Sequence, residues 1–209
     1  MSKVDSIEFM KSYCDFSDSN CVWVMKGISR NKDNPNNPNM HKFFRRMVLT
    51  SLEDIESCYD DIHRNVIATN PATIYRIYIS LNSRNVVTAS FEFQKKLVDI
   101  NHGLAKNQKD ALNHAKKIGS LWKTELAQRR CRGTKRFLLD IDYLENYPDK
   151  IYNFIQQNLN TKVYCVRKTV SGWAIVFDAC DTRSLMAYCK DQSFDVDLQR
   201  DSMLFIECF

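Results

Sequence analysis

The second half of the chain alternates strand-like and helix-like segments in a fixed order, and no other feature of the sequence constrains the fold as much. Its strand-like segments are short and apolar, and residues 151, 154 and 155 of its first helix-like segment are apolar at helical spacing. In chain order we expect a strand at residues 136–143, a helix at 148–159, strands at 162–168 and 173–177, a helix at 182–190 and a strand at 203–209. This β-α-β-β-α-β succession is typical of a ferredoxin-like or RRM-like unit, so we expect an α+β fold.

The first half of the chain carries its own strand and helix patterns. We expect helices at residues 6–13, 51–65 and 83–100, strands at 21–25, 41–50 and 74–81, and a polar loop at 31–39. A long basic helix is predicted from residue 105 to residue 130, because residues 112, 115, 118 and 122 place apolar side chains on one helical face. We therefore divide the chain into an N-terminal α+β unit (1–104), a basic helix that serves as connector (105–134) and an RRM-like unit (135–209).

Composition excludes several classes of protein. The chain has 209 residues, of which 44% are hydrophobic, and only five are glycine and four proline, so it is expected to be globular rather than disordered or collagenous. No apolar run is long enough to span a membrane, and the first residues lack the apolar core of a signal peptide. The eight cysteines contain no CxxC pair, which favours free thiols in a reducing cytoplasm over disulfides or a zinc site.

Charge is distributed unevenly along the chain. Residues 101–136 contain ten lysines and arginines against two acids, a net charge of +8, whereas residues 137–209 contain seven against eleven, a net charge of −4. A basic face attracts phosphate backbones, so we expect the basic helix to contact nucleic acid. The residues expected to make this contact are Lys116, Lys117, Lys123, Arg129 and Arg130. The alternative is an ordinary solvated helix beside an acidic surface.

Asp140 and Asp142 are the strongest candidates for chemistry. They alternate with Leu139 and Ile141 on a predicted strand, so both carboxylates should point to one face of the sheet. Neighbouring carboxylates repel each other unless a cation lies between them, which suits Mg²⁺ or Mn²⁺. The alternative is that the pair lies at an exposed strand end.

A third acid could come from the segment before the last predicted strand, which in an RRM-like sheet would lie beside the first strand. Asp195 and Asp197 alternate and share a face, and Asp201 follows them. We expect Asp195 and Asp197 to join the metal site, with Asp197 as the third catalytic acid. The alternative is an acidic surface loop.

Two further segments could hold a nucleotide or a nucleic acid. The turn between the predicted strands at 162–168 and 173–177 offers Ser171, the backbone of Gly172 and the preceding Lys168 as phosphate ligands, although a plain hairpin turn explains the same residues. On the strand at 74–81, Arg76 lies on the same face as a tyrosine and a serine, and Arg84 follows the strand. Such a face can contact a phosphate backbone and stack on bases, unless it is simply the wet face of an edge strand.

The motifs of the second half together resemble the archaeo-eukaryotic primase superfamily, including the primase-polymerases of phages and plasmids. The segment FLLDID at 137–142 resembles the family's hhhDhD strand, and TVSGW at 169–173 resembles the start of its T-x-S/N-G-x-H motif. Asp195, Asp197 or Asp201 could supply the family's final acid. The chain departs from the family at Ala174, which stands where the family has a histidine that contacts the incoming nucleotide.

This resemblance implies a primase-polymerase-like nucleotidyltransferase that lies in the cytoplasm, or in the host cytoplasm if a phage encodes it. It would use Mg²⁺ or Mn²⁺ and have nucleic acid and nucleoside triphosphates as partners. Two alternatives remain open at this point. One is a non-enzymatic module that binds DNA or RNA on a degenerate primase fold, which the absence of the histidine favours. The other is a metal-dependent nuclease in which the same carboxylates activate water.

Overall fold

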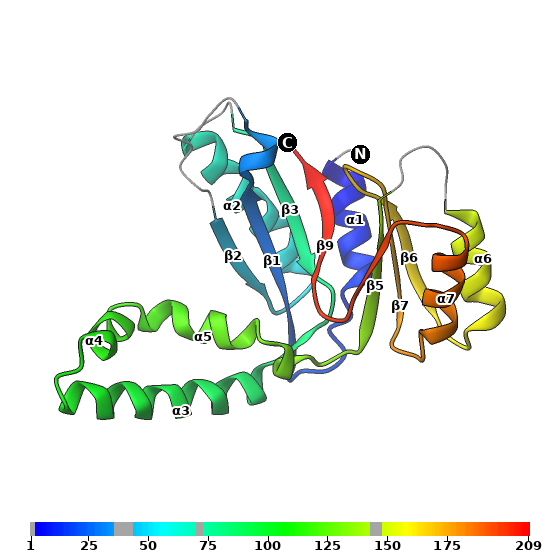
Figure 1. Cartoon of the computed structure of the whole chain (residues 1–209). Coiled ribbons are helices and arrows are strands. Elements are labelled where there is room, and N and C mark those ends of the chain that lie inside the picture. The colour runs from blue at the N-terminus through cyan, green and yellow to red at the C-terminus, as the bar shows by residue number, and fades with distance from the viewer. Residues whose placement is uncertain (1–2, 36–43, 70–72, 143–147) are drawn as a thin grey trace.

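The computed structural model describes residues 3–35, 44–69, 73–142 and 148–209. In these residues it shows a mixed fold of two antiparallel sheets and seven α-helices (Figure 1). The α+β class predicted from the sequence is therefore confirmed. None of the described helices combines the length and the apolar character that a membrane span requires.

The first sheet is built by the front half of the chain together with its last strand. Its strands are β1 (Cys21–Ser29), β2 (Phe44–Leu49), β3 (Tyr75–Ser80), β4 (Arg84–Asn85) and β9 (Met203–Cys208). They lie in the order β2-β1-β3-β9, with β4 paired to β1, and each of these pairs is antiparallel. The helices α1 (Lys3–Tyr13) and α2 (Glu53–Thr69) accompany this sheet, and a 3-10 helix, η1 (Asn31–Asp33), follows β1.

Alternation along the strands decides which face of the first sheet is buried. Trp23 and Met25 of β1 are fully buried, as are Ile77 and Ile79 of β3, and all four pack with apolar side chains of α1 and α2. Both helices therefore cover the same face of the sheet. The residues between these positions, Arg76 and others, point to the opposite face, as the alternation predicts.

The second sheet contains β5 (Arg136–Ile141), β6 (Val163–Lys168), β7 (Trp173–Asp178) and β8 (Val196–Gln199), with α6 (Asp149–Asn158) and α7 (Arg183–Asp191) between them in the chain. The strand order is β6-β7-β5-β8. Leu139 and Ile141 of β5 pack against α6 and α7, which cover the outer face of this sheet (Figure 1). On the inner face, Leu138 and Val176 join the apolar core of the first sheet, so the two sheets are held together by a shared core.

The last strand does not lie where the sequence predicts it. We expected residues 203–209 to pair with the first strand of the C-terminal unit, but β8 takes that place beside β5, and β9 pairs with β3 of the first sheet. Burial explains the difference, because Leu204 and Ile206 complete the core beneath the first sheet. Beyond β9, the N–H of Phe209 donates to the carbonyl of Tyr75 at 2.9 Å, and the N–H of Tyr75 donates to the carbonyl of Phe209 at 3.1 Å.

The predicted basic helix at 105–130 is also wrong as a single element. The chain runs outward along α3 (Val86–Ala105) and returns along α4 (Lys109–Ala115), α5 (Ile118–Leu126) and the 3-10 helix η2 (Arg129–Cys131), forming a helical arm (Figure 1). Asn107 adopts a positive φ of 55° in the turn, a conformation that asparagine tolerates. Gly103 lets α4 approach α3, since a Cβ at this position would lie 2.7 Å from the Cβ of Ala111.

A buried ion pair ties the first sheet to the segment that leads into β9. Arg84 donates two hydrogen bonds to the carboxylate of Asp201, at 2.9 and 3.0 Å, and the two side chains are 4% and 10% exposed. Two buried charges in this geometry satisfy each other, whereas either one alone would be left uncompensated in a poorly solvated site. The pair therefore fixes where the chain crosses from the second sheet back to the first.

Replacing one member of this pair should strongly destabilise the fold. We expect Asp201→Ala to lower the free energy of unfolding by about 3–5 kcal/mol, because it leaves the Arg84 guanidinium buried without its carboxylate. The apolar double variant Arg84→Met/Asp201→Leu should recover most of that loss. Urea unfolding followed by circular dichroism measures both. The exposed pair of Arg183 and Asp181 gives the control, since solvent screens this pair and Arg183→Ala should cost far less stability than Asp201→Ala.

Candidate functional site

A cavity of about 350 Å³ lies between the inner face of the second sheet and the open face of the first. We call it the acidic cavity, because Asp140 and Asp142 line it. The second sheet also contributes Ser171 and Ala174 to the lining, and the first sheet contributes Arg76 and other side chains described below. The structure thus gathers the two predicted carboxylates, the predicted turn and one predicted arginine around one space.

The alternation of β5 places both carboxylates in the acidic cavity. Leu139 and Ile141 face the core under α6 and α7, so Asp140 and Asp142 project from the other face, as predicted. The turn between β6 and β7 reaches the same place, where Ser171 Oγ donates to Asp142 Oδ1 at 3.3 Å. The backbone N–H of Asp142 donates to the carbonyl of Asp195 at 3.1 Å, which holds the end of β5 against the segment before β8.

The environment of Asp140 opposes its ionisation. Burial raises the pKa of Asp140, and repulsion from Asp142 and Asp197 raises it further, while the positive charge of Lys32 acts in the opposite direction. Asp197 lies directly across the sheet from Asp140 in the pairing of β5 with β8, so it shares the same face. Like charges held this closely lower their energy when a cation binds between them.

These residues suit a divalent ion that is held partly by the protein and partly by a bound ligand. They suit less well an ion that is enclosed by protein groups alone. Among the described residues, no three or more His, Cys, Asp or Glu side chains are grouped so as to hold a metal. Asp195 and Asp197 are exposed, and Asp197 Oδ2 accepts a hydrogen bond from Gln199 at 3.0 Å. Mg²⁺ commonly takes one or two carboxylates and completes its shell with water and phosphate oxygens. Asp140 and Asp142 could hold an ion in this way.

The wall opposite the carboxylates is cationic. Arg30, Lys32 and Arg76 line it, and of these the sequence reasoning singled out Arg76 alone. Arg76 is buried and forms a two-bonded ion pair with Asp33, which fixes its guanidinium at the cavity wall. Lys32 is exposed and acts electrostatically on Asp140. Arg30 and Lys32 follow β1 directly in the chain, and no spacing in the sequence connects them to a strand more than a hundred residues later.

Ala174 lies on β7 directly opposite Asp140 and is 2% exposed. A histidine at this position would stand beside the carboxylate, whereas the methyl group of alanine offers no hydrogen bond or charge. None of the described lining residues of the acidic cavity is a histidine. Positive charge reaches the acidic cavity from the first sheet instead.

For two of the predicted phosphate ligands, Gly172 and Lys168, the structure shows different contacts. The N–H of Gly172 donates to Thr169 Oγ1 at 3.0 Å, and the N–H of Thr169 donates to the carbonyl of Gly172 at 2.8 Å, so the turn is closed by its own hydrogen bonds. Lys168 is exposed and lines a different cavity. Three residues of this turn were predicted to hold phosphate. Among the contacts that the structure describes, Ser171 is the one whose side chain bonds to a carboxylate of the acidic cavity.

The predicted nucleic-acid residues differ in how exposed they are and in the partners that hold them. Lys116, Lys117 and Arg129 are exposed on the arm. Arg130 is engaged by Glu125 and Glu92. Arg84 is buried in its pair with Asp201, where a nucleic acid does not reach it.

The base of the arm is fixed to β2 next to a cluster of cations. Arg46 donates to the carbonyl of Lys123 at 2.7 Å, and the Lys123 ammonium donates to the carbonyl of Arg46 at 3.4 Å. On the neighbouring strand, burial together with repulsion from Arg46 and Arg84 lowers the pKa of Lys26 to about 8, while Asp201 opposes this shift. No periodic signal in the sequence marks Lys26, because its two cationic neighbours, Arg46 and Arg84, come from separate segments of the chain.

Comparisons with known proteins add no assignment. No family model, no curated protein and no solved structure matches this chain.

The electrostatics of Asp140 predict how stability responds to removal of its charge. The fold raises the pKa of the Asp140 carboxyl group. The protonated group therefore contributes stability at pH values below the unfolded pKa of about 3.9. This contribution is lost as the pH rises through the pKa of the folded state. Asp140→Asn should therefore raise the Tm at pH 7 in metal-free buffer, by about 1–4 °C for a chain of this size.

Thermal unfolding between pH 4 and pH 8 measures this effect, and the difference between Asp140→Asn and the parent should widen as the pH rises. The control is Asp99→Asn, which removes an exposed carboxylate from α3 and should change stability by less than about 0.5 kcal/mol. A lower Tm for Asp140→Asn at pH 7 would show that the carboxylate stabilises the fold rather than straining it.

Proposed function

We propose that this chain is a primase-polymerase-like nucleotidyltransferase that extends a nucleic acid from nucleoside triphosphates with the help of divalent metal ions. The observation that carries the proposal is the pair of carboxylates, Asp140 and Asp142, facing a cationic wall across a cavity between two sheets. Carboxylates that attract a divalent ion, together with cations that attract phosphate, are the two requirements of phosphoryl transfer in one space.

The second sheet supports this proposal by its order. Residues 136–199 run β-α-β-β-α-β, and the strand order β6-β7-β5-β8 puts the first and third strands in the centre. This order supports an RRM-like arrangement of the second sheet. The carboxylates lie at the end of its first strand, and the turn with Ser171 adjoins them, as the motifs shared with archaeo-eukaryotic primases imply.

The chain's own residues would divide the work as follows. Asp140 and Asp142 would hold the divalent ions, which would supply the positive charge that neutralises the triphosphate. Arg30, Lys32 and Arg76 lie across the cavity, where they can contact phosphate oxygens. A primer 3′-hydroxyl would attack the α-phosphorus, forming a phosphodiester bond and releasing pyrophosphate. Ser171 orients Asp142 through its hydrogen bond.

Lys32 takes a particular part in this proposal. Ala174 leaves the position beside Asp140 without a polar group, and Lys32 is the cation whose charge acts on Asp140. A long flexible ammonium group can neutralise a phosphate oxygen from the opposite wall. We propose that Lys32 makes the contact with the incoming nucleotide that a histidine makes in the family.

A second candidate function is a non-enzymatic module that binds nucleic acid on the same fold. Two observations favour it: Ala174 stands beside Asp140, and the described residues hold no closed group of three metal ligands. This candidate keeps the basic arm as the binding surface and gives the acidic cavity no catalytic part.

Primer extension tests the catalytic proposal. With Mn²⁺, a labelled primer-template and nucleoside triphosphates, we expect extension that Asp140→Ala and Asp142→Ala each reduce by at least about 100-fold, because each removes a ligand of the ions. Lys32→Ala should reduce extension by about 10- to 100-fold, because one charge-assisted contact is lost. Asp99→Ala, which removes a carboxylate outside the acidic cavity, should leave the rate unchanged.

Calorimetric titration with Mn²⁺ separates the two candidates. Heat that disappears in Asp140→Ala supports the nucleotidyltransferase, whereas nucleic-acid binding with no heat from Mn²⁺ and no extension supports the non-enzymatic module. Shortening of the labelled strand without nucleotides would instead indicate hydrolysis by the same carboxylates. Full extension activity in both aspartate variants would overturn the assignment of the site.

The arm makes a separate prediction about nucleic-acid affinity. Each phosphate contact adds about 0.7–0.9 to the slope of log affinity against log salt concentration. The double variant Lys116→Ala/Lys117→Ala should therefore bind single-stranded DNA more weakly and lower that slope by about 1.5. Fluorescence anisotropy at several salt concentrations measures the slope. Lys162→Ala/Lys190→Ala removes two exposed cations outside the arm and should leave it unchanged; equal slopes in both double variants would exclude the arm as the contact surface.

A further inference from the structure

The open face of the first sheet carries a row of side chains beside the acidic cavity. Alternation puts Lys26 of β1 on the face opposite to Trp23 and Met25, which pack under α1 and α2. Strand pairing sets Lys26 directly beside Arg46 of β2 and, on its other side, beside Tyr78 of β3. Side chains that lie directly opposite in this way have Cβ atoms about 4.5–5.5 Å apart. Lys26 therefore stands between a cation and an aromatic ring.

The row connects the arm to the acidic cavity. Tyr78 pairs with Phe205 of β9, and the two rings lie edge to face with their centroids 5.9 Å apart. Both rings line the acidic cavity, whereas neither Lys26 nor Arg46 does, so the proposed reaction does not use these two cations. At the other end of the row, Arg46 donates to the carbonyl of Lys123 at the base of the arm.

The two cations of the row have no acidic partner. Among the described residues, neither Lys26 nor Arg46 forms an ion pair, and the Nε of Arg46 is buried without a hydrogen-bond partner. Asp201, the acid whose charge acts on Lys26, already accepts two hydrogen bonds from Arg84. Like charges that are gathered without an acid lower their energy when an anion binds between them.

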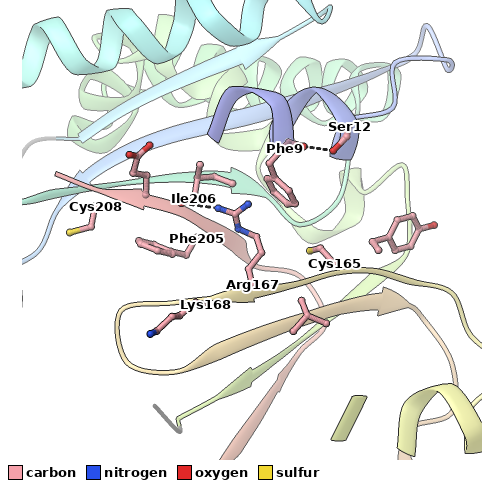
Figure 2. A pocket seen from close by; sticks show the side chains of 11 residues that line it. Phe9, Ser12, Cys165, Arg167, Lys168, Phe205, Ile206 and Cys208 are labelled. Atoms are coloured by element: carbon pink, nitrogen blue, oxygen red, sulfur yellow. Dashed lines mark hydrogen bonds between the residues drawn. The ribbon is translucent and has the colours of Figure 1, made fainter. Parts of the chain in front are cut away.

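Arg167 differs from these two cations, because its surroundings already hold its charge. It projects from β6 toward β9, where it donates to the carbonyl of Ile206 at 3.0 Å (Figure 2). Its guanidinium also lies 3.8 Å from the centroid of the Phe9 ring. Lys26 and Arg46 are therefore better placed than Arg167 to take an anionic ligand.

The neighbours of the two cations indicate what kind of anion fits. A phosphate between Lys26 and Arg46 would compensate both charges. Tyr78 is a half-buried ring beside them, and the ring of Phe44, which the Arg46 guanidinium approaches at 5.3 Å, is still 54% exposed. Cations interleaved with aromatic rings are typical of proteins that bind single strands, because unpaired bases stack on the rings. An acidic peptide would use the cations and leave the rings without a part.

We propose that this row binds single-stranded nucleic acid, with one backbone phosphate between Lys26 and Arg46 and an unpaired base stacked on Tyr78. The proposal stands on the strand register, on two cations without acidic partners and on the rings beside them. The binding does not require the acidic cavity to be catalytic. That the bound strand continues into the acidic cavity rests on the proposed function.

Fluorescence anisotropy in metal-free buffer tests the binding apart from catalysis. The probes are a labelled oligodeoxythymidylate and an abasic strand of the same length, which keeps the phosphates and lacks the bases. We expect the oligodeoxythymidylate to bind at least about tenfold more tightly, because its bases can stack. Equal Kd values, or no binding of either strand, would overturn the proposal. Displacement by polyglutamate as effective as by unlabelled oligodeoxythymidylate would indicate an acidic protein partner instead.

Lys26→Met removes the charge and keeps the long apolar stem of the side chain. We expect its Kd for oligodeoxythymidylate to rise by about 5- to 10-fold, and the slope of log affinity against log salt concentration to fall by about 0.7. The Tm should not fall, because the ammonium has no partner to lose and is repelled by Arg46 and Arg84. Lys11→Met, an exposed site on α1 across the sheet, should leave Kd and slope unchanged. An unchanged Kd in Lys26→Met would overturn the placement of the phosphate.

Two variants of Tyr78 test the stacked base. Tyr78→Phe keeps the ring, so it should bind oligodeoxythymidylate within about twofold of the parent. Tyr78→Leu loses the ring and should bind this strand about tenfold more weakly, while its Kd for the abasic strand stays that of the parent. Equal Kd values for oligodeoxythymidylate in the two variants would overturn the stacking on Tyr78.

Primer extension connects the row to the acidic cavity. If the bound strand is the one that is extended, Lys26→Met should raise the KM for primer-template by about 5- to 10-fold and change kcat by less than about twofold. A raised Kd with an unchanged KM would overturn this connection. If the parent protein extends no primer, the proposed function fails, and the anisotropy measurements still decide whether the row binds nucleic acid.

Discussion

The return of the last strand to the first sheet constrains everything that lies between the two sheets. β9 pairs with β3, and its apolar residues complete the core under α1 and α2. From this position it offers the carbonyl of Ile206 to Arg167 of the second sheet, and its Phe205 lines the acidic cavity. The buried pair of Arg84 and Asp201 fixes the crossing that precedes it. Without this crossing the carboxylates on β5 would have no cationic wall opposite them.

The two walls of the acidic cavity carry opposite charges, with carboxylates on one and cations on the other. The second sheet holds carboxylates, and burial together with their mutual repulsion raises the pKa of Asp140, whereas the cations opposite include Arg76, which its pair with Asp33 holds in place. Proteins often give up stability at sites where like charges are gathered for a task. Such a site gains most from a ligand that carries both signs, and a phosphate with its divalent ion is a ligand of that kind.

Local patterns in the sequence predict some features of the fold and of the acidic cavity but not others. The alternation around Asp140 and Asp142 predicts their common face, because the side-chain period of a strand does not depend on its partners. The partner of β9 could not be predicted, because pairing depends on contacts that span the chain. The same holds for Arg76 and Arg84, whose acidic partners lie 43 and 117 residues away. Helical periodicity continues through the arm, so it does not reveal that the chain folds back at Asn107 or that the returning segment is broken between α4 and α5.

Ala174 carries no charge, so the cations near Asp140 come from other positions in the chain. A histidine on β7 would belong to the same sheet as Asp140, so the distance between the two groups would be fixed by strand pairing. Here the cations that face Asp140 come from η1 and the end of β1, on the other sheet. The distance between acid and cation then depends on how the two sheets sit against each other, and that is set by their shared core and by the contacts of β9. A chain built in this way couples the balance of charges in the acidic cavity to the packing between its sheets, which a histidine on the strand itself would not require.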